Sequence, residues 1–597
     1  MSETSGGPGA IERPILANEP GDYWGSDAVA LMLREVDLPY VALNPGASYR
    51  GLHDSLVNLL GNSNPQMLLC LHEEHAVAIA HGYAKVTGRP MGAIVHSNVG
   101  LMHATMAIFD AWCDRVPVFV LGATGPVDAA KRRPWIDWIH TAQDQGALIR
   151  NFSKWDDQPA SVAAAAESVL RAYKMMTTPP CGPVYICLDA ALQESRIGAL
   201  PPLPSADRFR PPRPAAADPA AVAEAAALLQ GAERPLILVG RTSRGDAEWQ
   251  HRVQLAEALG AIVLTDAKTG AGFPSRHRLQ GPPAGNNPSE AACALIRQAD
   301  VVLSLDWVDL AGALKAGWGT EPVGSKIILA SLDHLAHNGW SMDYQGLPPT
   351  DLHLAVEPDT AVAALLPLLT PRQPGWPDRP AATLQRPDLG SGEAITPLGL
   401  AAALREAVGS RPTCLIRSPL AWAGNTWDVA HPLDALGGDG GGGVGAGPGM
   451  AVGAALALRG SGRLPVAVLG DGDYLMGCTA LWTAAHYRLP LLVVVSNNNS
   501  FFNDELHQDR MARQRNRPVA NRWIGQRIAD PEPDLGMLAK AQGGEGFGPI
   551  RRPDELPRAL RAAIECVEAG GVAVVDVRVE PGYAPINSAA IARGTTG

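Results

Sequence analysis

The sequence of 597 residues lacks several features, and each shortage excludes a class of protein. Its eight cysteines show no CxxC pair and no regular spacing, so they indicate reduced, buried thiols rather than a zinc site or a disulfide framework. No basic and then apolar segment opens the chain, and no apolar run approaches the length that spans a membrane. We therefore expect a cytoplasmic protein with no membrane partner. A net charge of −11 argues against a nucleic-acid partner.

Short runs of Val, Ile and Leu alternate with Ala-rich helical stretches along most of the chain. Strands that are apolar throughout and alternate with helices predict parallel sheets covered on both faces. The expected strands cover residues 91–95, 116–121, 183–187, 235–239, 261–264, 301–305, 466–469, 491–495 and 572–577.

Two proline-rich stretches, residues 200–215 and 366–397, cannot sustain a helix or a central strand and so divide the chain. The fold class that follows is α/β, with three doubly wound parallel-sheet domains. We expect a loose N-terminal segment followed by the three domains, at residues 1–20, 21–198, 216–366 and 395–597.

The segment from Gly470 to Ser500 contains a Gly-Asp-Gly turn directly after one expected strand, and two asparagines after the next. Asp471 and Asn498, with the main-chain carbonyl of Ser500, would offer Mg²⁺ three hard oxygen ligands. The flanking glycines let the backbone approach a diphosphate. A lone Gly-Asp-Gly is usually a tight turn, but the spaced asparagines favour a cofactor site.

This pattern resembles the signature of enzymes that use thiamine diphosphate. The glycine-dense stretch 437–458 is similar to the loop that holds the pyrimidine in that family. By this resemblance, Val444 is the wedge beneath the two rings of the cofactor, and the carbonyl of Gly442 accepts the 4′-amino hydrogen. The resemblance implies one set of cofactor-binding residues: Gly442, Val444, Gly470, Gly472 and Asp473.

Residues 72–84, which begin His-Glu-Glu-His, resemble the stretch that supplies the activating glutamate in acetolactate synthase and benzoylformate decarboxylase. The resemblance implies that Glu73 hydrogen bonds to N1′ of the aminopyrimidine and promotes the tautomer that removes the C2 proton. An acidic pair that merely favours a helix dipole is the alternative. Metal binding is not indicated, because the histidines do not have HExxH spacing.

The loop around His96 and Ser97 resembles the His-Ser loop of benzoylformate decarboxylase, and His277 could be the second histidine of that enzyme. Both would then be catalytic. For His96, a loop histidine satisfied by backbone groups is an equal alternative. The chain departs from the decarboxylase after its Asn-Pro-Gly turn, where Ala47 precedes Ser48.

Residues 500–528 form a basic block in an acidic protein. Its arginines could pair with Glu505 and Asp509 on a solvated helix, or could capture a carboxylate, a phosphate or a coenzyme A tail. Six arginines make up the block: Arg510, Arg513, Arg515, Arg517, Arg522 and Arg527.

The resemblance covers nearly the whole chain and implies a pyrimidine-binding, a central and a diphosphate-binding domain. It implies a Mg²⁺- and thiamine diphosphate-dependent 2-oxo acid decarboxylase or carboligase. A 2-hydroxyacyl-CoA lyase or oxalyl-CoA decarboxylase, and a non-catalytic cofactor-binding protein, are the alternatives. The expected partner is a small 2-oxo acid or acyl-CoA. A homodimer or homotetramer follows, because the family builds each site across two subunits; FAD or ADP in the central domain stays open.

Overall fold

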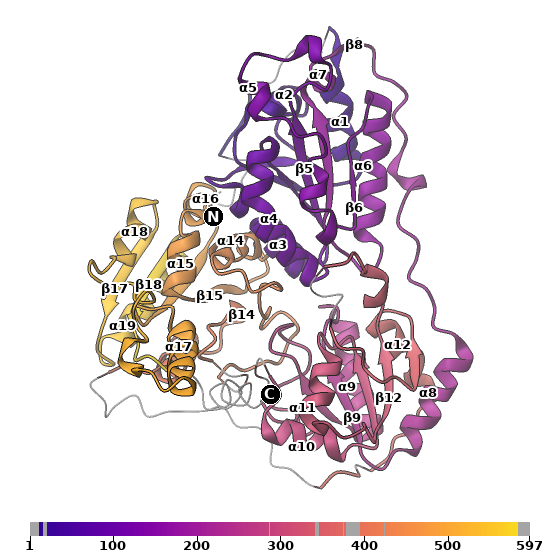
Figure 1. Ribbon diagram of the computed structural model, residues 1–597, viewed down its shortest axis with the longest axis vertical. Coiled ribbons are helices and arrows are strands. Elements are labelled where there is room, and N and C mark those ends of the chain that lie inside the picture. Colours follow the sequence, from indigo (N-terminus) through magenta and orange to yellow (C-terminus); the bar gives the residue numbers. More distant parts are fainter. Residues whose placement is uncertain are drawn as a thin grey trace, which may run out of the picture.

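The computed structural model describes residues 11–15, 21–283, 285, 287–340, 345–373, 375–377, 394–422, 424 and 426–582. Within this part of the chain, three parallel sheets each have helices packed on them (Figure 1), so the predicted fold class is confirmed. Most of the predicted loose N-terminus, at residues 1–10 and 16–20, lies outside the described residues. No helix among the described residues is both long enough and apolar enough to cross a membrane.

The first domain contains a six-stranded parallel sheet with the order β3-β2-β4-β5-β7-β6. Its strands are β2 (Tyr40–Leu43), β3 (Gln66–Leu69), β4 (Met91–Ile94), β5 (Val118–Thr124), β6 (Trp155–Asp157) and β7 (Val184–Asp189). Its helices include α1 (Gly25–Glu35), α2 (Arg50–Asp54), α3 (Glu73–Thr87), α4 (Ser97–Cys113), α5 (Ile136–Ile139), α6 (Val162–Thr177) and α7 (Ala190–Gln193). A small antiparallel ribbon pairs β1 (Tyr23–Trp24) with β8 (Arg196–Gly198).

The central domain contains a five-stranded parallel sheet with the order β10-β9-β11-β12-β13. Its strands are β9 (Pro235–Val239), β10 (Ile262–Thr265), β11 (Val301–Leu305), β12 (Lys326–Ala330) and β13 (Leu352–Leu354). Its helices include α8 (Pro219–Gly231), α9 (Asp246–Leu259), α10 (Glu290–Gln298), α11 (Leu310–Trp318) and α12 (Pro358–Leu365).

The third domain contains a five-stranded parallel sheet with the order β14-β15-β16-β18-β17. Its strands are β14 (Thr413–Arg417), β15 (Leu464–Gly470), β16 (Leu491–Asn497), β17 (Glu545–Ile550) and β18 (Val572–Arg578). Its helices include α13 (Pro397–Val408), α14 (Ala446–Ala457), α15 (Asp471–Gly477), α16 (Ala480–His486), α17 (Phe502–Gln514), α18 (Leu535–Ala541) and α19 (Leu556–Glu568).

The strands form where the apolar runs predict them, since each run is buried between helices. The predicted strands at Pro235–Val239 and Val301–Leu305 coincide with β9 and β11 residue for residue. One expectation about the interior is wrong: all eight cysteines are free thiols, but Cys181, Cys293 and Cys566 are only partly buried. None of the three lies in a sheet: Cys181 lies between α6 and β7, and Cys293 and Cys566 lie in α10 and α19.

The first and third domains share one hydrophobic core, which runs through the contact between α3 and α14. The two helices approach so closely that a Cβ on Gly82 would lie 2.1 Å from the Met450 carbonyl oxygen. A Cβ on Gly453 would lie 1.9 Å from the carbonyl oxygen of Ile79. Glycine at both positions therefore allows the two domains to dock through these helices (Figure 1).

Candidate active site

The Gly-Asp-Gly turn lies where β15 ends and α15 begins, at the carboxyl edge of the third sheet. Asp471 is buried, with 5% of its surface exposed. Its Oδ1 accepts a hydrogen bond from Gly472 N at 2.9 Å, and its Oδ2 accepts one from Ser500 N at 3.0 Å. Burial raises the pKa of the Asp471 carboxyl, and a cation beside it would restore the charged form.

Asn498 follows β16, the strand that pairs with β15 in the sheet. Its side-chain oxygen accepts a hydrogen bond from Ser500 N at 3.1 Å, so the amide of Asn498 and the carboxylate of Asp471 face the same backbone N–H. The structure thus brings these two predicted ligands together. A carboxylate oxygen and an amide oxygen side by side are a donor set that fits Mg²⁺.

The glycine loop, residues 437–445, leads into α14 beside this turn. Gly442 has a positive φ of 75° and no atom within 4 Å of the place where a Cβ would lie. The next side chain, Val444, is 48% exposed. An open backbone position and an uncovered aliphatic side chain are what a loop needs to receive a flat ring and support it from below.

Asp473 holds the glycine loop in place. Its Oδ1 accepts hydrogen bonds from Gly445 N at 2.8 Å and from Gly447 N at 3.3 Å. Its Oδ2 accepts one from Arg417 Nε at 3.0 Å. Both carboxylate oxygens thus have protein partners, and Asp473 ties the start of α15 to the glycine loop.

The same loop is fastened to the first domain by a buried set of charged groups. Arg417 pairs with Asp439 at 2.6 Å, and Gly441 N donates to Asp110 Oδ1 at 3.1 Å. Burial, with Asp439 beside it, raises the pKa of Asp110 to about 9. Asp110 is therefore a neutral acid at pH 7, which lets it lie against a second carboxylate in the interior.

Beside this pair, Lys85 donates to Asp114 at 2.5 Å and to the carbonyl of Gly438, so a helix of the first domain also holds the loop. His81 contacts the same oxygen of Asp114 at 2.8 Å. Burial opposes ionisation of Asp114, but Lys85 and His81 outweigh it and lower the pKa of this carboxyl to about 2. The ionised Asp114 carboxylate thus balances the positive charge of Lys85 in the interior.

Glu73 is the first residue of α3 and is 5% exposed. Its Oε2 lies 3.0 Å from Nδ1 of His103, which comes from α4. A Cβ on Gly100 would lie 2.8 Å from Glu73 Oε1, so glycine at that position leaves room for the carboxylate. The predicted activating residue is therefore placed by α4 as well as by its own helix.

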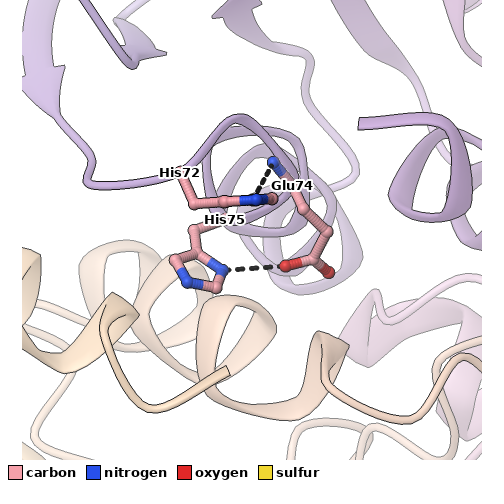
Figure 2. Close-up of side chains that lie close together, drawn as sticks. All are labelled: His72, Glu74 and His75. Atoms are coloured by element: carbon pink, nitrogen blue, oxygen red, sulfur yellow. Dashed lines mark hydrogen bonds and ion pairs between the residues drawn. The ribbon is translucent and has the colours of Figure 1, made fainter. Parts of the chain in front are cut away.

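The adjacent residues His72, Glu74 and His75 form a compact cluster (Figure 2) whose possible ligand atoms lie within 4.8 Å of one another. Glu74 N donates to His72 Nδ1 at 3.2 Å, and His75 Nδ1 contacts Glu74 Oε2 at 2.8 Å. His75 Nε2 contacts Thr479 Oγ1 of the third domain at 2.8 Å. Both His75 nitrogens thus have protein partners, and these hydrogen bonds account for the cluster as a helix cap and a domain contact.

His96 comes shortly after β4 and occupies the position before α4, where its side chain makes no capping hydrogen bond. Its Nδ1 lies 2.9 Å from Ser48 Oγ, and its ring meets that of His140 edge to face at a centroid distance of 4.6 Å. Burial, with His140 next to it, lowers the pKa of His96 and favours the neutral ring. Ser48 thus contacts His96 although it is displaced by one residue from the decarboxylase pattern.

His277 does not join this group. Its Nε2 lies 3.2 Å from Glu257 Oε1, its Nδ1 accepts a hydrogen bond from Leu279 N at 3.2 Å, and its ring packs on Phe273. All three partners belong to the central domain. Within one chain, His277 has the contacts of a residue that orders its own loop.

Three of the six arginines in the basic block pair with two acids of the third domain. Asp509 pairs with Arg513 at 2.5 Å and with Arg522 at 2.7 Å, and buried Glu505 pairs with Arg527 at 3.3 Å. Glu505 also accepts a hydrogen bond from Ser500 Oγ at 2.6 Å. These contacts are those expected for the first alternative, in which arginines of a solvated helix pair with Glu505 and Asp509.

Sequence reasoning missed several residues that shape the site: Asp110, Asp439, Arg417, His103 and His140. Each acts through a partner that lies at least 22 residues away in the chain, so no local pattern marks it. Of the neighbouring acids Asp110 and Asp439, only Asp439 is marked in the sequence, because it is an aspartate within the glycine-dense loop.

Three family models match the chain, all described as parts of a thiamine pyrophosphate enzyme. They are the N-terminal TPP binding domain at residues 23–148, the central domain at residues 222–311 and the C-terminal TPP binding domain at residues 418–577. With this fold and this site, the chain belongs to the thiamine pyrophosphate enzymes, a family of C–C bond lyases and transferases.

Several relatives are similar to the chain along most of their length. An acetolactate synthase from Bacillus subtilis (strain 168) is 24% identical over 93% of both chains. A benzoylformate decarboxylase from Pseudomonas aeruginosa is 25% identical, over 73% of this chain and 79% of the relative. The crystal structure of benzoylformate decarboxylase from Polynucleobacter necessarius has the same fold, with a TM-score of 0.78 and 21% identity over 94% of this chain and 99% of that one.

Proposed function

We propose that the protein is a Mg²⁺- and thiamine diphosphate-dependent decarboxylase or carboligase that acts on a free 2-oxo acid. The observation that carries the proposal is the convergence of Asp471 Oδ2 and Asn498 Oδ1 on Ser500 N, at the carboxyl ends of adjacent strands. A magnesium ion held there would bind the diphosphate of the cofactor. When bound, thiamine diphosphate supplies the electron sink that decarboxylation of a 2-oxo acid needs.

The remaining residues of the site would orient the cofactor and move protons. Val444 would support the rings, with Asp473 and Arg417 holding its loop. Glu73 would donate to the pyrimidine, a role that suits a carboxyl with 5% of its surface exposed. His96, kept neutral by burial, would take up or release a proton at the substrate carbon, with Ser48 fixing its ring.

The proposed assembly is a homodimer, or a tetramer built from dimers, with each active site shared between two subunits. The surface around the glycine loop supports it, because exposed apolar side chains gather there. Met106 lies against the loop, where a Cβ on Gly443 would be 2.9 Å from its Cε, and Met476 lies against Gly445. The exposed members are Val99 at 37%, Met102 at 58%, Met106 at 38%, Val444 at 48% and Met476 at 60%.

An acyl-CoA substrate is the weaker alternative. It would need free arginines to bind the coenzyme phosphates, and three of the six in the basic block, Arg513, Arg522 and Arg527, already pair with Asp509 and Glu505. A protein that binds the cofactor without turnover is the other alternative, and the presence of Glu73 together with Asp471 and Asn498 in the chain argues against it, because Glu73 is needed only for activation of the cofactor.

The experiment that tests the proposal measures exchange of the cofactor C2 proton by NMR, together with CO₂ release from a panel of 2-oxo acids. Glu73→Gln should slow the exchange by about 10²- to 10⁴-fold, because an amide cannot share the proton that activates the pyrimidine. Glu74→Gln is the matched control, since Glu74 pairs with His75 and should not affect exchange. Wild-type exchange in Glu73→Gln, or cofactor binding without CO₂ release from any 2-oxo acid, would contradict the proposal.

A further inference from the structure

A cavity of about 110 Å³ lies between the central and third domains, and among its described lining residues Gly437 also belongs to the glycine loop. Thr265, the last residue of β10, lines it from one side, and Leu415 in β14 lines it from the other. The cavity thus lies at the carboxyl ends of strands from two parallel sheets, where α/β proteins bind their ligands. An engineered apolar cavity of about 150 Å³ binds benzene, so this volume suits a single six-membered ring.

Three of the residues that line the cavity are aromatic, and its walls carry no free charge among the described residues. Phe273 comes from the central domain, and Trp422 and Trp427 come from the third, with their rings nearly parallel at a centroid distance of 6.4 Å. The one charged lining residue is Arg276, which pairs with Asp428 at 2.7 Å. An uncharged ring therefore fits these walls, and an anion does not.

One lining residue, Gln280, has a hydrogen-bond acceptor that lacks a donor. Gln280 is 9% exposed, and its side-chain oxygen is buried with no hydrogen-bond partner. Its side-chain nitrogen makes only a long contact of 3.5 Å to Thr265 Oγ1. A buried acceptor without a partner destabilises the folded protein, and a ligand O–H or N–H group would remove that cost.

The cavity adjoins the glycine loop. Gly437, the first residue of that loop, lines the cavity, and so does Ser418. In the sequence, Arg417 comes between the lining residues Leu415 and Ser418. It pairs with Asp473 and Asp439 at the candidate active site. A molecule in the cavity would therefore lie next to the loop proposed to hold the cofactor.

We propose that this cavity binds a single uncharged aromatic ring that bears a hydrogen-bond donor, with Gln280 accepting the hydrogen bond and the tryptophans flanking the ring. The ring belongs either to the substrate, which makes the substrate a hydroxyaryl 2-oxo acid, or to a separate small molecule. The first source rests on the proposed function, but the binding chemistry of the cavity does not.

The test uses phenol as the probe and toluene as its counterpart without a donor, with binding to the full-length protein measured by ligand-observed NMR. Phenol should bind, and Gln280→Leu should weaken it by about 3- to 10-fold while leaving toluene unchanged, because the substitution removes only the acceptor. Gln542→Leu is the matched control, since Gln542 also has a side-chain oxygen without a partner but does not line the cavity. Absence of phenol binding, or equal phenol affinity in Gln280→Leu and wild type, would overturn the proposal.

Competition then distinguishes the two sources. If the ring is part of the substrate, phenol raises the KM for 4-hydroxyphenylpyruvate but not for pyruvate, and Gln280→Leu raises the same KM. If phenol binds through Gln280 and competes with neither acid, a separate ligand is the occupant. Failure of the proposed function would appear as no CO₂ release, and it would leave phenol binding unaffected.

Discussion

Asp473 of the Gly-Asp-Gly-Asp segment accepts a hydrogen bond from the backbone N–H of Gly445 at 2.8 Å, across 28 residues of chain. This contact ties the helix that begins at the proposed metal site to the loop that would support the cofactor rings. With Arg417 on its other oxygen, Asp473 fixes how these two parts lie relative to each other. One carboxylate therefore fixes the relative position of the two parts that are proposed to bind the diphosphate and the rings.

Replacing Asp473 by Ala should lower the stability of the cofactor-free protein and weaken cofactor binding together. The change leaves Arg417 buried with one partner fewer, which costs about 3 kcal/mol. Asp473→Asn should have a smaller effect, since its oxygen can still accept from Gly445. Thermal denaturation without cofactor and calorimetric titration with thiamine diphosphate measure the two effects. A loss of affinity at unchanged stability would instead indicate direct contact with the cofactor.

Asp471→Ala should abolish Mg²⁺-dependent binding of thiamine diphosphate. The change removes the charged ligand and leaves two phosphate groups facing a site without a cation. Calorimetric titration with thiamine diphosphate, with and without Mg²⁺, measures this loss of affinity. Asp504→Ala is the control, because Asp504 is an exposed carboxylate in the nearby helix α17. Cofactor affinity equal to wild type in Asp471→Ala would remove the metal assignment.

The contribution of Asp110 to the stability of the protein should fall as the pH rises from about 4 to about 9. Its folded-state pKa, raised to about 9 by burial and by Asp439, lies above the value near 4 expected in the unfolded chain. Between these values the unfolded chain binds fewer protons, so this contribution is complete below pH 4 and is lost as the pH approaches 9.

Asp110→Asn should flatten this pH dependence, because the amide resembles the protonated acid and can still accept from Gly441. Denaturation temperatures measured from pH 5 to 9 test the difference. The substitution alters none of the titratable groups around Asp110 and its neighbour Asp114, which are Asp439, Arg417, Glu74, Lys85 and His81. The exposed Asp144→Asn is the control. An unchanged pH slope in Asp110→Asn would show that Asp110 is ionised in the folded protein.

Replacing Arg515 and Arg517 together by Ala should leave kcat/KM for a free 2-oxo acid within about twofold of wild type. Both side chains are exposed, and neither takes part in the ion pairs of Glu505 and Asp509. Surface charges of this kind contribute little. Arg522→Ala is the comparison, since it breaks contacts with both acids and should destabilise the helix. A steep rise in KM for an acyl-CoA substrate in the double variant would favour the coenzyme A alternative.

The sequence by itself determined the three parallel sheets and the placement of the metal-ligand candidates. Buried parallel strands are apolar along their whole length, so β9 and β11 could be located to the residue. Asp471 and Asn498 each follow such a strand directly. Because β15 and β16 are parallel neighbours, their ends meet at the same edge of the sheet, and local spacing was sufficient to bring the two side chains together.

Only the tertiary structure decided which side chains support the site. Asp110 meets the glycine loop, Glu73 meets His103, and His96 meets Ser48 through the docking of separate elements, which no short-range pattern encodes. Arg244 shows the reason most clearly: it donates to carbonyls of Lys85, Thr269, Pro432, Ala435 and Leu436, and so joins all three domains. Backbone carbonyls are the same in every residue, so the sequence carries no mark of such partners, and only the packed chain reveals them.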